Sequence, residues 1–475
     1  MVNLWQMQLH PGQSDWDIKE IDNILLNYSV IGMGIEWDND RGAPNRFRNE
    51  VQIGDIVVVR HQGAPRYLVE VTGECKTNEG NNKLDVWFEL YRKVNILSDK
   101  GEYYRDKYHK DTKLRWSDGL FAPTTFQTAS NWNFARFWYN DLKRIKNMKQ
   151  YKTILTSNYN IILTGAPGTG KTYLAKQIAA QMILEKDYDE RTASEEEKIK
   201  MKEQYDFVQF HPSFDYTDFV EGLRPYEDEK GNVGFKREDG IFMKFCRKAL
   251  DAYNKAENKE ETPKYVFVID EINRGDISKI FGELFFSIDP GYRGEKGKVK
   301  TQYSNLWKTE KYGDSNSFYI PQNVYIIGTM NDIDRSVESM DFAMRRRFAF
   351  KEILAEDNMG MLKTNEKLLP HFDKIEKRMK NLNRAILTIQ GLSTAYQIGP
   401  AYFLKLENYL ESDGELGDGS WESLWDNHLN SLLFEYLRGL PDAEEDLETL
   451  RSAYMLADLY KKENGKVIKE PSQNA

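Results

Sequence analysis

The residues of this chain best suited to chemistry begin at Gly165. Gly165, Gly170, Lys171 and Thr172 fit the pattern G-x-x-x-x-G-K-[ST]. Glycines let successive backbone N–H groups converge on an anion, the lysine reaches the β- and γ-phosphates of a nucleotide, and the threonine hydroxyl ligates Mg²⁺. We therefore predict a phosphate-binding loop made of Gly165, Pro167, Gly168, Thr169, Gly170, Lys171 and Thr172.

Two adjacent carboxylates, Asp270 and Glu271, directly follow the apolar run 266–269. Such a run predicts a buried parallel strand, which delivers the side chains after it to the carboxyl edge of a sheet, where ligands bind. We expect Asp270 to share Mg²⁺ with Thr172, directly or through water. We expect Glu271 to polarise the attacking water as the general base.

A further apolar run, 324–327, leads to Asn331, which the strand would place near the γ-phosphate. Its amide can orient a water molecule but cannot act as a base. Asp334 and Arg335 follow directly. We include both in the predicted catalytic set.

Three adjacent arginines end the next predicted helix, at positions 345–347. An arginine placed against the γ-phosphate of a neighbouring subunit stabilises the charge of the transition state. Surface ion pairs are the alternative, but they contribute little and need no such clustering. The predicted catalytic residues are Glu271, Asn331, Asp334, Arg335, Arg345 and Arg346.

The elements that must position these residues follow from the pattern around them. The apolar run 161–163 enters the phosphate loop, and a helical pattern leaves it. From about residue 351 onward the pattern is helical. The chain therefore predicts an α/β fold whose parallel sheet carries the site, followed by a helical lid. The segment 291–321 is rich in turn formers and is expected to form a hairpin.

The first part of the chain predicts a small mixed β-barrel or sheet, because short apolar strands alternate there with turns and only 16–28 is helical. Its many aromatic side chains are either core or the walls of a pocket that stacks on a nucleobase. The segment 126–150 is aromatic and then basic. We expect a linker helix whose aromatic side docks on the next domain and whose basic face is solvated or contacts phosphates.

Composition narrows the class of protein. The 475 residues are too many for one ordinary core and predict several domains. A formal charge of -9 argues against a non-specific nucleic-acid coat. Two cysteines are too few for a disulfide framework, the start lacks a signal-peptide pattern, and no run is long and apolar enough to span a membrane. We expect a cytoplasmic protein.

The order of these motifs resembles an AAA+ NTPase, and in finer detail the NTPase subunit of McrBC-type restriction systems, which cleave modified DNA. The resemblance is carried by six segments: 208–213 (VQFHPS), 222–225 (GLRP), 270–274 (DEINR), 330–336 (MNDIDRS), 345–348 (RRRF) and 398–403 (IGPAYF). It implies a homo-hexameric ring, hydrolysis of ATP or GTP with Mg²⁺, and a separate McrC-like nuclease subunit. Asp332 stands where the family has threonine, which leaves the nucleotide preference open.

The N-terminal part resembles the EVE family of PUA-like domains, which hold a flipped, modified base in an aromatic cage. The motifs are Trp5-x-Met7, the segment 32–37 (GMGIEW), an Arg/Asn-rich turn and Gly54-Asp55. The resemblance implies cage walls at Trp16 and Trp37. Arg46 and Arg48 would contact backbone phosphates or form a solvated turn.

Together these observations predict four regions: an EVE/PUA-like reader (1–125), a linker helix (126–150), an AAA+ large α/β subdomain (151–355) and an AAA+ helical lid (356–475). The predicted function is an NTP-driven ring motor that reads modified DNA bases and drives a nuclease. The alternatives are an NTP-dependent assembly switch whose first domain binds RNA or a protein, without cleavage, and a first domain with a purely structural role.

Overall fold

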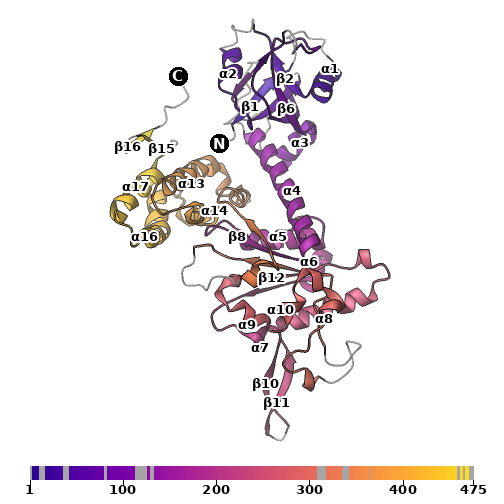
Figure 1. The fold of residues 1–475 in the computed structure, drawn as a ribbon. Coiled ribbons are helices and arrows are strands. Elements are labelled where there is room, and N and C mark those ends of the chain that lie inside the picture. The colour runs from indigo at the N-terminus through magenta and orange to yellow at the C-terminus, as the bar shows by residue number, and fades with distance from the viewer. Residues whose placement is uncertain are drawn as a thin grey trace. The chain divides into compact units, whose positions relative to one another are not determined.

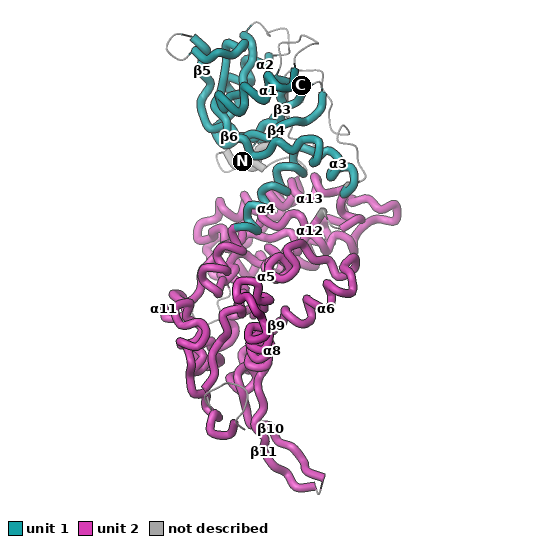
Figure 2. Tube along the Cα trace, turned by 90° about the vertical axis from the view of Figure 1, so that its right-hand side faces the viewer, with its two compact units in different colours: residues 1–149 teal, residues 150–475 magenta. Residues whose placement is uncertain are grey.

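The computed structural model describes residues 3–9, 17–35, 42–61, 63–79, 83–112, 126–128, 133–229, 231–307, 317–333, 342–363, 365–456, 460–463 and 466–469. The chain divides into two compact units, Met1–Lys149 and Gln150–Ala475 (Figure 2). Each unit is built around its own sheet. Among the described residues, no helix is long and apolar enough to cross a membrane.

Unit 1 is built on a mixed sheet of strand order β2-β6-β4-β3-β1-β7, with β5 paired to β6. β1 and β3 are parallel, and the other pairings of this sheet are antiparallel. The strands are β1 (Leu4–Gln8), β2 (Val30–Met33), β3 (Ile56–His61), β4 (Ala64–Val71), β5 (Lys76–Thr77), β6 (Leu90–Ser98) and β7 (Phe126–Thr128). The predicted small mixed β domain is confirmed.

Both faces of this sheet are apolar, as β3 shows. Val57 and Val59 face one core, while Ile56 and Val58 face a second core, because successive strand residues point to opposite faces. The helical stretch expected at 16–28 is confirmed by α1 (Ile18–Asn23), which continues as a π-helix over Ile24–Tyr28. Two helices of this unit were not predicted: α2 (Ala43–Asn49), where we expected a turn, and α3 (Gly101–Thr112).

The linker helix α4 (Asn133–Asn158) begins in unit 1, later than the predicted start at 126, and runs beyond the predicted end at 150. Its Phe134 and Trp138 are fully buried in the second core of unit 1, where Trp138 stacks on Tyr104 of α3. The expectation that these aromatic residues dock on the next domain is therefore wrong. The second apolar face of the sheet is instead buried against α4.

Unit 2 contains a five-stranded parallel sheet of order β14-β8-β13-β12-β9 (Figure 1). The strands are β8 (Asn160–Thr164), β9 (Tyr205–Gln209), β12 (Tyr265–Asp270), β13 (Val324–Thr329) and β14 (Ala349–Glu352). β8, β12 and β13 are almost wholly buried, as their continuous apolar runs predict. Because the strands are parallel, the segments that follow them meet at one edge.

Helices and turns surround this sheet. The helices are α5 (Lys171–Ile183), α6 (Glu195–Gln204), α7 (Tyr216–Phe219), α8 (Ile241–Lys255), α9 (Ile277–Phe281), α10 (Leu284–Ser287) and α11 (Phe342–Arg345). A two-stranded hairpin of β10 (Glu221–Glu227) and β11 (Val233–Asp239), not predicted from the sequence, projects from the body of this unit (Figure 1). In the described parts of the expected 291–321 hairpin, a single bridge joins Val299 and Phe318.

The lid follows β14 and has its own apolar core. Its helices are α12 (Gly360–Lys363), α13 (Phe372–Ile386), α14 (Pro400–Phe403), α15 (Asp418–Leu424), α16 (Asn430–Leu437) and α17 (Ala443–Met455), followed by the strands β15 (Tyr460–Glu463) and β16 (Lys466–Lys469). α13 packs against α17, and Trp425 stacks on Tyr454 in the core. The predicted fold, a P-loop parallel sheet with a helical lid, is confirmed.

Candidate functional site

The phosphate loop connects β8 to α5 and depends on glycine. Gly165, Gly168 and Gly170 have φ values of 137°, 72° and 79°, in the region that L side chains rarely adopt. A Cβ atom at Gly165 would also lie 2.3 Å from the carbonyl oxygen of Ile353. The backbone of the loop therefore favours glycine at these three positions, of which Gly165 and Gly170 belong to the motif.

Lys171 is buried at the first turn of α5. Its Nζ donates hydrogen bonds to the carbonyl oxygens of Gly165 (3.0 Å) and Ala166 (2.8 Å). Burial lowers the pKa of Lys171 to about 8, although Glu271, Asp332 and Asp270 act in the opposite direction. The ammonium group and these three carboxylates therefore occupy one site.

Asp270 ends β12 and lies beside Thr172. The hydroxyl of Thr172 donates to Asp270 Oδ1 at 2.7 Å, and the hydroxyl of Thr329, at the end of β13, donates to the same oxygen at 2.6 Å. A threonine hydroxyl and a carboxylate are oxygen ligands of the kind that Mg²⁺ takes in nucleotide sites. The residues predicted to hold the metal are thus close enough to share one ion.

Glu271 has left-handed backbone angles, φ 51° and ψ 47°, which are uncommon for a residue with a side chain. Its backbone N–H donates to the hydroxyl of Thr329 at 3.2 Å. The Asn331 amide donates to Glu271 Oε1 at 2.7 Å, and Arg274 Nε lies 3.4 Å from Oε2. Burial raises the pKa of Glu271, against the lowering effect of Arg274. A partly desolvated carboxylate held at both oxygens is suited to accept a proton from water.

Asp332 is a site residue whose role sequence reasoning missed. The motif showed only that an aspartate replaces a threonine. In the structure burial raises its pKa, while Lys171, Arg345 and a hydrogen bond with Thr164 act against that rise. Thr329 was missed as well, because a threonine at a strand end carries no sequence signal of its own.

The arginine triplet divides by burial. Arg345 and Arg346 are exposed, and the guanidinium of Arg345 lies 5.5 Å from the centre of the Phe350 ring. Arg347 is buried, donates to the carbonyl oxygen of Ala343 at 2.5 Å and lies 4.0 Å from the centre of the Phe285 ring. Arg347 is therefore part of the core, while Arg345 and Arg346 are accessible to another molecule.

Four predicted site residues lie outside the described part of the chain: Trp16, Trp37, Asp334 and Arg335. The described neighbours Arg46 and Arg48 lie in α2, where we expected a turn. The predicted cage and the second half of the 330–336 motif stay predictions.

The lid contacts the phosphate loop directly. The N–H of Gly399 donates to the carbonyl oxygen of Pro167 at 3.1 Å, and that of Ala401 to the carbonyl oxygen of Gly168 at 2.9 Å. A Cβ atom at Gly168 would lie 2.5 Å from the Tyr402 ring. Movement of the lid would therefore change these contacts with the phosphate loop.

We compared the chain with known proteins. Residues 160–348 match the family described as "AAA domain (dynein-related subfamily)". The type IV methyl-directed restriction enzyme EcoKMcrB subunit of Escherichia coli (strain K12) is 38% identical over 256 residues, which cover 52% of this chain and 48% of that protein. The type II restriction enzyme BsuMI component YdiS of Bacillus subtilis (strain 168) is 24% identical over 235 residues, or 45% of this chain and 62% of that protein. The chain thus covers about half of the first relative's length.

A solved structure of a putative ATPase from Cytophaga hutchinsonii ATCC 33406 matches at 14% identity, with a TM-score of 0.25, over 66% of this chain and 95% of that one. That likeness is too weak to carry any part of the assignment.

The parallel sheet, the phosphate loop and the matched AAA domain define the chain as an AAA+ nucleoside-triphosphatase. Within this class the chain is McrB-like, since its NTPase region is homologous to the Escherichia coli subunit. Its substrate is accordingly a nucleoside triphosphate. Both relatives are named as components of restriction enzymes.

Proposed function

We propose that this chain hydrolyses ATP or GTP to drive a separate nuclease subunit against DNA that carries modified bases. The proposal rests on one observation: Lys171, Thr172, Asp270 and Glu271 lie together at one edge of the sheet. The chain is also 38% identical, over 256 residues, to a methyl-directed restriction subunit. The relative's name supplies the modified substrate. Its description as a subunit favours a nuclease partner that is McrC-like.

Each residue of the site has its own role in the proposed hydrolysis. The glycines of the loop present backbone N–H groups to the phosphates, and the Lys171 ammonium balances their charge. Thr172 and Asp270 would hold Mg²⁺, which neutralises charge on the phosphate oxygens when bound. Glu271 accepts the proton of the attacking water, and Asn331 keeps its carboxylate in place.

The proposal includes a reader and a ring. Trp16 and Trp37 of unit 1 would form the cage for the modified base. Arg345 and Arg346 would reach the phosphates of a neighbouring copy in a homo-hexamer, which their exposure permits. Asp334 and Arg335 would complete the catalytic set, and the protein would work in the cytoplasm.

The test is steady-state turnover of the purified chain with ATP and with GTP, each with unmodified DNA, with methylated DNA, and with an McrC-like nuclease subunit. We expect turnover with at least one nucleotide and cleavage only of modified DNA in the complete mixture. Turnover without cleavage of any DNA would favour an assembly switch. Absence of turnover under all conditions would refute the proposal.

A further inference from the structure

The hairpin of β10 and β11 has one apolar and one charged face. Residues directly opposite each other in an antiparallel pair share a face. One face carries the pairs Leu223↔Arg237, Pro225↔Phe235 and Glu227↔Val233. Leu223, Val233 and Phe235 are 41%, 74% and 69% exposed. The projecting part of this face is thus apolar and open to solvent.

The opposite face holds Arg224 and Lys236, a directly opposed pair. Both cations are already neutralised: Arg224 lies 2.7 Å from Asp218, and Lys236 lies 2.8 Å from Glu238. Little positive charge is therefore left for nucleic-acid phosphates.

The turn of the hairpin is acidic. Between the strands the chain runs DEKGN, and together with Glu227 at the end of β10 this gives three carboxylates at 227–229 against one lysine. Phosphate groups would be repelled by this tip, and so would the tip of an identical hairpin from a second copy. A polypeptide that offers apolar side chains bordered by lysine and arginine fits both the face and the tip.

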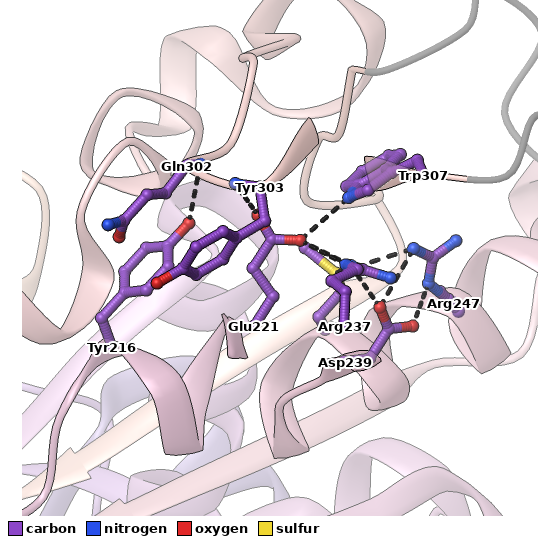
Figure 3. Close-up of polar contacts among 9 residues, drawn as sticks. Tyr216, Glu221, Arg237, Asp239, Arg247, Gln302, Tyr303 and Trp307 are labelled. Carbon is purple, nitrogen blue, oxygen red and sulfur yellow. Dashed lines mark hydrogen bonds and ion pairs between the residues drawn. The ribbon is translucent and has the colours of Figure 1, made fainter. Parts of the chain in front are cut away.

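The base of the hairpin is fixed by a buried carboxylate, Glu221 (Figure 3). Arg237 Nε donates to Glu221 Oε2 at 2.7 Å, across the two strands. The backbone N–H of Tyr303 (2.8 Å) and the indole N–H of Trp307 (2.9 Å) donate to the same carboxylate. The hairpin is thereby tied to the segment that follows the Val299 bridge.

A second set of contacts stiffens the same base (Figure 3). Asp239 pairs with Arg237 at 2.5 Å and also with Arg247 of α8. The guanidinium groups of Arg237 and Arg247 lie 4.9 Å and 5.1 Å from the centre of the Trp307 ring. A hairpin held this way at its base presents its apolar face in one orientation, which reduces the entropy lost on binding.

We infer that the apolar face of the β10–β11 hairpin, formed by Leu223, Pro225, Val233 and Phe235, docks the nuclease subunit. The inference rests on the proposed function, which supplies that subunit. An exposed apolar sheet face marks an interaction site on a soluble protein, and the acidic tip selects a partner with a basic border. Because a nuclease binds the phosphates of DNA, we expect lysine and arginine on its surface.

The test places the photocrosslinker p-benzoylphenylalanine at position 235 of the full chain. A matched control carries it at position 199 of α6, where the isoleucine is 56% exposed. Each chain is irradiated alone and with the McrC-like nuclease subunit. We expect position 235, and not position 199, to crosslink to the nuclease.

A substitution measures the energetic contribution. The variant Val233→Ser/Phe235→Ser should bind the nuclease at least about tenfold more weakly than Ile199→Ser, because exposed anchors of an interface dominate its affinity. Turnover of the chain alone and its melting temperature should stay unchanged, since neither side chain is buried.

The outcomes separate the inference from the function it rests on. Crosslinks from position 235 to a second copy, or none at all while the wild-type chain binds the nuclease, overturn the inference alone. A wild-type chain that hydrolyses nucleotide but binds no nuclease overturns the inference and the proposed partner together. A chain without turnover refutes the proposed motor, whatever the hairpin contacts.

Discussion

The side-chain amide of Asn331 donates a hydrogen bond of 2.7 Å to Oε1 of Glu271. The two residues follow neighbouring parallel strands, β13 and β12, so the sheet itself sets their distance. The contact gives Asn331 a role that its chemistry allows, because an amide can fix a carboxylate without competing for its proton. The same strand ends place Thr329 between Glu271 and Asp270.

Replacing the base should stop hydrolysis and leave binding intact. Glu271→Gln keeps the size of the side chain but removes the proton acceptor, so we expect turnover to fall by about 10² or more. Binding of a fluorescent nucleotide should change little, because the cradle is untouched. The matched control is Glu195→Gln on the exposed start of α6. Full turnover by Glu271→Gln would show that another group is the base.

Removing the amide should lower kcat with little effect on KM. Asn331→Ala frees Glu271 Oε1, so we expect a kcat reduced about 10-fold to 10²-fold. Asn331→Gln keeps the amide one methylene further out and should recover part of the rate. A rise in KM alone, with kcat unchanged, would mean that Asn331 contacts the nucleotide and does not position the base.

The sequence predicted those site residues correctly that lie in a short motif directly after a buried strand. Lys171, Asp270, Glu271 and Asn331 follow apolar runs whose parallel pairing brings their ends together. The prediction worked because continuous burial leaves a clear pattern in the sequence. The helix after the loop and the helical lid were likewise readable from periodicity.

Other features depend on contacts between distant segments. The β10–β11 hairpin has alternating exposed residues that read as a loop, and its base is fixed by Tyr303 and Trp307, far along the chain. The aromatic side of α4 was assigned to the wrong domain, because an amphipathic helix does not reveal which core it covers. The role of Asp332 could not be predicted, because it depends on the closeness of Lys171 in the folded chain.

Removing the extra carboxylate should tighten nucleotide binding. Asp332 shares the site with Lys171, so its charge opposes the triphosphate there. Asp332→Asn should lower the Kd for nucleotide without Mg²⁺ roughly fivefold, the size expected for a partly screened like charge. Asp332→Glu, which keeps the charge, is the control. Weaker binding by Asp332→Asn would instead assign Asp332 to the metal site.

The two thiols should differ in reactivity. Burial raises the pKa of Cys75, which is half-buried, and of Cys246, which is fully buried. Because the thiolate is the reactive form, raising the pH should speed labelling of Cys75 by DTNB, whereas Cys246 should react only after denaturation. Cys75→Ser should abolish labelling of the folded chain. Rapid labelling of Cys246 without denaturant would contradict its burial.

Substituting the exposed Arg346 and the buried Arg347 should affect different properties of the protein, turnover in the first case and stability in the second. Arg346→Ala should lose turnover but not stability, because its side chain is exposed. Arg347→Ala should lose about 2–4 kcal/mol of unfolding free energy in guanidinium titrations, because it removes a buried group bonded to Ala343 and packed on Phe285.

If Arg346 acts on a neighbouring copy, mixing Arg346→Ala chains with Glu271→Gln chains should restore part of the activity, since some interfaces then pair an intact arginine with an intact base. No recovery at any mixing ratio, with mixed rings verified by mass spectrometry, would rule out action between copies.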